Sequence, residues 1–105
     1  MNYRVVITGL GVVSPNANTI EKFEHTLRQG ISGIRYHPYL QQLNFTCQVA
    51  GVPEGIEDIG VKYFTEEHRL AMNSSMLYAA VAAVECWRDA GFQYAKEDVP
   101  TMLWL

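Results

Sequence analysis

The sequence predicts an α/β fold, and three segments carry that prediction. Residues 3–8 are a β-branched run closed by a Gly-Leu-Gly sequence, which is typical of a strand buried on both faces. Residues 66–90 form an alanine-rich helix that is apolar around most of its circumference. Residues 101–105 are uncharged and apolar, and we interpret them as the beginning of a further buried strand that is cut off before its end. A helix buried on more than one side, next to buried strands, indicates a layered α/β structure.

Length and composition predict one domain with too little surface charge for its size. The chain has 105 residues, of which 49% are hydrophobic and 18% are charged. An average soluble domain carries roughly 25% charged residues, and a disordered chain would need more charge and less apolar content. We therefore expect residues 1–105 to be an incomplete domain, part of whose surface is covered by a partner.

The charge distribution and the apolar runs exclude two classes of partner. The net charge is −3, and the eight Lys and Arg residues are scattered from Arg4 to Lys96, so no nucleic-acid footprint is expected. The uncharged run of residues 70–84 is shorter than the ~20 residues that cross a bilayer, and no signal peptide is recognisable. The sequence predicts a soluble, cytoplasmic protein with no membrane contact.

A first helix is expected over residues 19–29. Asn18 or Thr19 is a suitable N-cap, and Gly30 stands where a left-handed residue ends helices. Apolar positions three to four residues apart are expected to face inward; they are Ile20, Phe23 and Leu27.

Residues 31–64 are expected to have little regular structure, because glycines and prolines divide them into short apolar pieces. The best strand candidate is residues 45–52. Long irregular stretches in compact domains are usually functional or covered by another segment.

The helix over residues 66–90 is expected to begin after Thr65 and to end at Gly91. One apolar stripe is expected along this helix, which should be buried on more than one side: Met72, Met76, Ala79, Ala80, Ala83, Trp87 and Ala90. Four further apolar residues are expected to fill the remaining circumference: Leu77, Val81, Ala82 and Val84.

Two glycine-containing patterns suggest nucleotide or nucleophile sites, and both depart from the motif. Gly9 and Gly11 follow a predicted strand, but Ser14 stands where the dinucleotide fingerprint needs a third glycine, and residues 31–35 lack the ribose-binding acid. Ser32 follows a helix and lacks the last glycine of a nucleophile elbow. Both segments are interpreted as turns.

The cysteines and histidines form no catalytic or metal-binding pattern along the chain. Cys47 is expected in a strand, and Cys86 is expected to be a small core residue of the long helix. His25, His37 and His68 share no metal-ligand spacing and are expected on surfaces or loops.

Four segments, in order, resemble the β-ketoacyl-acyl-carrier-protein synthases, the condensing enzymes of fatty acid and polyketide assembly. Residues 4–15, Arg-Val-Val-Ile-Thr-Gly-Leu-Gly-Val-Val-Ser-Pro, look like the amino-terminal signature of that family. Residues 30–34 resemble the loop after its first helix, residues 49–51 its next short strand, and residues 79–91 its alanine-rich helix. The resemblance covers essentially the whole chain.

The resemblance implies the N-terminal portion of a thiolase-like fold with αβαβα layers. Such enzymes join an acyl thioester to malonyl-acyl carrier protein by decarboxylative Claisen condensation, using a cysteine and two histidines, or a histidine and an asparagine. Those positions are expected beyond Leu105, so no catalytic, cofactor-binding or metal-binding residue is assigned here, and no cofactor is expected. Acyl carrier protein, acyl and malonyl thioesters, and a homodimeric or heterodimeric partner are the implied partners.

Two other functions remain open from the sequence. The chain could be a non-catalytic scaffold or interaction module, similar to the inactive chain-length-factor partners of some condensing enzymes. A nucleotide-binding module is the third hypothesis, which Ser14 and Arg35 weaken.

Overall fold

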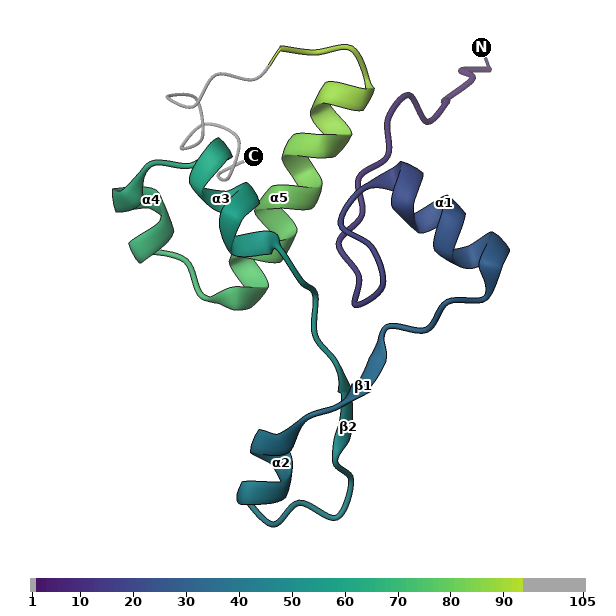
Figure 1. Cartoon of the computed structure of the whole chain (residues 1–105). Helices are drawn as coiled ribbons and strands as arrows, with labels where there is room; N and C mark the ends of the chain where they lie inside the picture. Colours follow the sequence, from purple (N-terminus) through teal and green to yellow (C-terminus); the bar gives the residue numbers. More distant parts are fainter. Residues whose placement is uncertain (1, 94–105) are drawn as a thin grey trace.

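The computed structural model describes residues 2–93 as five helices and one small sheet (Figure 1). The elements, in chain order, are α1 (Ile20–Gln29), β1 (Ile34–Tyr36), α2 (Pro38–Gln42), β2 (Val49–Gly51), α3 (Ile56–Tyr63), α4 (Glu66–Leu70) and α5 (Ser74–Asp89). None of the helices within this described range is long and apolar enough to cross a bilayer. The structure is therefore a mixture of helices and a small antiparallel sheet.

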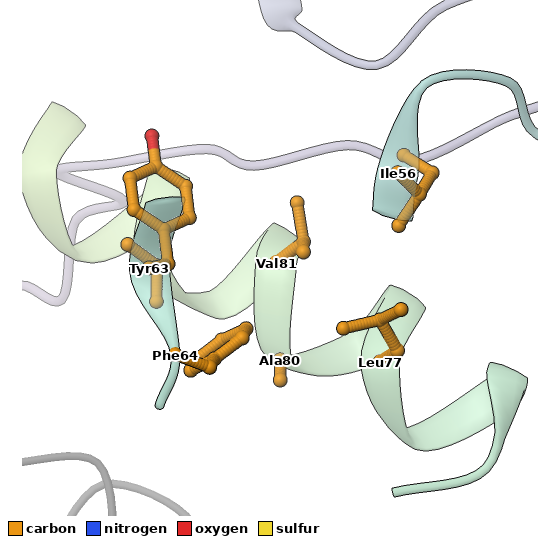
Figure 2. Close-up of a cluster of buried hydrophobic side chains, with 7 residues drawn as sticks. Ile56, Tyr63, Phe64, Leu77, Ala80 and Val81 are labelled. Carbon is orange, nitrogen blue, oxygen red and sulfur yellow. The ribbon is translucent and has the colours of Figure 1, made fainter. Parts of the chain in front are cut away.

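The hydrophobic core lies between α3 and α5 (Figure 2). Its buried members are Ile56, Tyr63, Phe64, Leu77, Ala80, Val81 and Val84. Three of these side chains, Phe64, Val81 and Val84, are at most 1% exposed. The Cα radius of gyration is 16.6 Å, whereas about 13 Å is expected of a compact domain of this length. The core is thus small, and much of the chain extends away from it.

The first helix is confirmed, including both of its caps. The Thr19 side chain accepts a hydrogen bond from the backbone N–H of Lys22, and Gly30 adopts a left-handed φ of 65°. The predicted inward face is wrong at Leu27, which is 62% exposed, whereas Thr26 is buried. Thr26 donates its hydroxyl to the Phe23 carbonyl, so the polar side chain is satisfied inside its own helix.

The predicted helix over residues 66–90 is wrong as one continuous helix, because the chain interrupts it at residues 71–73. Thr65 caps α4 as expected, and its hydroxyl accepts from the His68 N–H. Asn73 then caps a new helix, its side chain accepting from the Met76 N–H at 2.9 Å. Asparagine competes with the helical backbone for hydrogen bonds, so it begins α5 here instead of continuing α4.

The long helix is expected to be buried on more than one side, but much of its apolar stripe is exposed within residues 2–93. Met76 is 49% exposed and Trp87 41% exposed, and Ala79 and Ala83 are exposed as well. The buried face of α5 consists of Ala80 from that stripe together with Leu77, Val81 and Val84. The helix is apolar nearly all round, so periodicity could not decide which stripe would meet α3.

Residues 31–64 contain more regular structure than the sequence predicts. β1 and β2 pair antiparallel, with Ile34 opposite Gly51 and Tyr36 opposite Val49. The strand candidate at residues 45–52 is confirmed at its carboxyl half. α3 is a helix that the sequence does not predict, because it contains Gly60 and directly follows Gly55; Gly55 adopts a left-handed φ of 73° just before the helix.

Residues 3–8 are not a buried strand, which corrects the first prediction. Tyr3, Val5 and Ile7 are 83%, 91% and 83% exposed. A strand exists only where another strand receives its backbone hydrogen bonds, and no segment within residues 2–93 pairs with this one. The predicted strand at residues 101–105 lies outside the described residues.

Candidate functional site

The glycines of the first motif allow residues 9–11 to cross α5 in direct backbone contact. A Cβ atom on Gly11 would lie 1.9 Å from the Ala82 carbonyl oxygen, and one on Gly9 would lie 2.4 Å from the Cys86 carbonyl oxygen. The helix residues at this crossing are small and four positions apart: Ala82, Cys86 and Ala90. The Gly-Leu-Gly sequence therefore serves close packing against a helix, and this face of the motif leaves no space for a phosphate.

Two hydrogen bonds fasten the crossing segment to α5. The Cys86 thiol donates to the Gly9 carbonyl at 3.3 Å, and the Leu10 N–H donates to Asp89 Oδ2 at 2.9 Å. Cys86 is half-buried, which agrees with a structural role more than with a reactive one. Asp89 was not singled out by the sequence, because its partner is a backbone group 79 residues away.

Ser14 closes a tight turn and is engaged there. The backbones of Ser14 and Ala17 exchange two hydrogen bonds of 2.8 and 3.2 Å. The Ser14 hydroxyl also accepts from the Ala17 N–H and donates to Asn16 Oδ1. A hydroxyl held this way positions a loop, which agrees with its interpretation as a turn residue.

Pro15 brings two other family-like segments together. A Cβ atom on Gly33 would lie 2.4 Å from the Pro15 carbonyl carbon, and one on Gly51 would lie 2.7 Å from Pro15 Cγ. Asn16 Nδ2 also donates to the Ile31 carbonyl at 3.1 Å. We call this assembly, residues 9–17 with Gly33, Gly51 and the Ala82–Ala90 face of α5, the motif junction.

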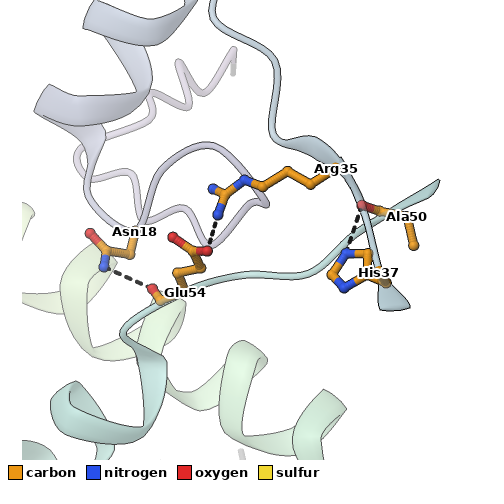
Figure 3. A network of polar contacts seen from close by, with 5 residues as sticks. All are labelled: Asn18, Arg35, His37, Ala50 and Glu54. Atoms are coloured by element: carbon orange, nitrogen blue, oxygen red, sulfur yellow. Dashed lines mark hydrogen bonds and ion pairs between the residues drawn. The ribbon is translucent and has the colours of Figure 1, made fainter. Parts of the chain in front are cut away.

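A polar cluster beside the motif junction joins the residues at the base of the hairpin formed by β1 and β2 (Figure 3). Arg35 and Glu54 form an ion pair, and Asn18 Nδ2 donates to the Glu54 carbonyl at 3.1 Å. His37 Nε2 lies 3.1 Å from the Ala50 carbonyl, to which it donates. The Arg35 and Glu54 side chains are 48% and 67% exposed, so their ion pair contributes less than about 1 kcal/mol.

A second polar group joins α3 to α5. The Tyr63 hydroxyl donates to Glu85 Oε1, and Arg88 Nη1 donates to the same hydroxyl oxygen at 2.8 Å. Burial raises the pKa of Tyr63 above its ordinary 10.0, and the bond to the Glu85 carboxylate adds to the rise. Arg88 opposes these effects but does not cancel them.

Tyr63→Phe is expected to lower the free energy of unfolding at pH 7 by about 1–2 kcal/mol, because Glu85 and Arg88 lose a buried partner. The raised folded-state pKa means that the stabilising effect is complete below the unfolded-state pKa of 10.0 and is lost as pH rises through the folded-state value. The difference between wild type and variant should therefore shrink above pH 10.0. Urea unfolding of the wild type and the variant, at pH 7 and above pH 10.0, measures this difference in stability.

Tyr3→Phe is the matched control, because Tyr3 is 83% exposed. It should change the stability by no more than about 0.5 kcal/mol. A Tyr63→Phe effect that stays constant into the alkaline range would contradict the role assigned to the hydroxyl proton.

An open cavity of about 270 Å³ lies where residue 10 meets α1 and α5. Its lining is mainly charged: Leu10, Ile20, Glu21, Glu85, Arg88 and Asp89. Asp89 and Glu85 are already bonded to Leu10 and Tyr63. Within residues 2–93, no three acidic, histidine or cysteine side chains are grouped so as to hold a metal ion.

The remaining candidate residues do not converge on this cavity. Ser32 accepts from the Ile34 N–H in an exposed loop. Cys47 is exposed and precedes β2, which corrects its expected place inside a strand. His25 lies on α1, and His68, half-buried, lies on α4. That no residue of this chain is catalytic stays a prediction.

The comparisons with known proteins indicate one family. Residues 2–103 match the family described as "Beta-ketoacyl synthase, N-terminal domain". A 3-oxoacyl-[acyl-carrier-protein] synthase 2 of Vibrio cholerae is 30% identical over 95 residues, which are 90% of this chain and 22% of that protein. The corresponding synthase 2 of Vibrio harveyi is 28% identical over 95 residues, again 90% of this chain and 22% of the relative.

A third relative extends the same likeness. The 3-oxoacyl-[acyl-carrier-protein] synthase 1 of Buchnera aphidicola from Acyrthosiphon pisum is 32% identical over 87 residues, 83% of this chain and 21% of the relative. The chain thus spans about a fifth of the length of the curated relatives that it matches. The chain belongs to the β-ketoacyl synthase family, whose N-terminal domain it matches over residues 2–103.

Proposed function

We propose that this chain is the N-terminal part of a β-ketoacyl-acyl-carrier-protein synthase, which condenses an acyl thioester with malonyl-acyl carrier protein in fatty acid biosynthesis. The family match over residues 2–103 and the relatives named as 3-oxoacyl-acyl-carrier-protein synthases support this proposal. A synthase of polyketide assembly would carry out the same condensation on another acyl substrate. The whole enzyme is proposed to be cytoplasmic and to bind acyl carrier protein. Its complete fold is proposed to have αβαβα layers.

The proposed role of these residues is to build the framework of the domain rather than its catalytic centre. The observation that carries this role is the motif junction, where Gly9, Gly11 and Gly33 bring backbones into contact and Gly51 lies against the Pro15 ring. The motif residues that identify the family are thus used in packing. The nucleophilic cysteine and its histidines are proposed to lie beyond Leu105, with no cofactor or metal required.

A chimera tests the proposal. The matching segment of the Vibrio cholerae synthase 2 is replaced by residues 2–103 of this chain, and formation of 3-oxoacyl-acyl carrier protein is followed. We expect kcat/KM within about tenfold of the parent enzyme. The 105-residue chain alone should form no product.

A pair of variants tests whether the inserted segment supports the fold through its motif glycines, or whether the enzyme would accept any sequence there. In the chimera, Gly11→Val should abolish activity together with folding, whereas Gly60→Ala should leave both intact, because only the first side chain would meet helix backbone. A folded but inactive chimera would favour the non-catalytic module. Condensation by the isolated chain would overturn the placement of the catalytic residues.

A further inference from the structure

We draw no further inference here: the strongest candidate, the exposed apolar surface of the β1–β2 hairpin over residues 34–51, carries none, because nothing in the part of the chain that the structure describes shows what covers it.

Discussion

Gly11→Val is expected to lower the free energy of unfolding by at least about 3 kcal/mol, at or beyond the upper end of ordinary overpacking effects. Even the first side-chain atom would lie 1.9 Å from the Ala82 carbonyl oxygen and 2.8 Å from the Cys86 nitrogen. Both are backbone atoms of α5, so no rotamer change relieves the overlap. Residues 9–11 must separate from the helix, which also breaks the hydrogen bond from Leu10 to Asp89. Urea unfolding followed by far-ultraviolet circular dichroism measures the loss.

Gly60→Ala is the control for this prediction. Its Cβ atom would lie 3.0 Å from Leu77 Cδ1, the end of a side chain that can shift. Alanine is also favoured over glycine inside a helix by up to about 1 kcal/mol. The two effects should nearly cancel, leaving the stability within about 1 kcal/mol of wild type. Equal losses for Gly11→Val and Gly60→Ala would refute close backbone contact as the reason for the motif glycine.

Local signals in the sequence predicted the helix ends that are made by neighbouring residues. Thr19, Gly30 and Thr65 act on backbone groups within three or four positions, so their caps could be predicted from adjacent sequence alone. Asn73 carries the same kind of signal, but it stood inside a long apolar pattern and was outweighed by it. The interruption of residues 66–90 therefore had a recognisable cause in the sequence.

Long-range contacts are the part that local patterns could not supply. The resemblance indicated that four segments belong to one family, but not that Gly33 and Gly51 would both lie against Pro15. Likewise, Asp89 and Tyr63 acquire their roles from partners 79 and 22 residues away. The periodicity of α5 allowed several buried faces, and only contact with α3 selects one.

Residues 3–8 show a different limit of prediction from sequence composition. Its β-branched composition is suited to a strand, yet strand formation needs hydrogen bonds from a second segment. Residues 2–93 do not supply one, so Val5 stays 91% exposed. Composition thus predicts what a segment is able to form, whereas the available partners determine what it does form.

Phe64→Ala is expected to remove about 3–5 kcal/mol of stability, the range measured for a large aromatic side chain deleted from a core. Phe64 is 1% exposed at the end of α3, and it packs in the cluster with Val81 and Val84 of α5. Its ring meets the Tyr63 ring edge-on at 6.4 Å between centroids, so the variant also loses an aromatic pair. Because small domains have only about 5–15 kcal/mol in total, the loss removes a large part of the margin.

Leu70→Ala is the control, since Leu70 is 81% exposed and should change the stability by no more than about 0.5 kcal/mol. The Phe64 backbone N–H keeps its 2.8 Å bond to the Gly60 carbonyl in either variant, so the comparison isolates the side chain. A Phe64→Ala chain as stable as the Leu70→Ala chain would show that α3 and α5 do not form the stabilising core. The motif junction would then be the principal contact that holds α5, and Gly11→Val would be the more damaging substitution.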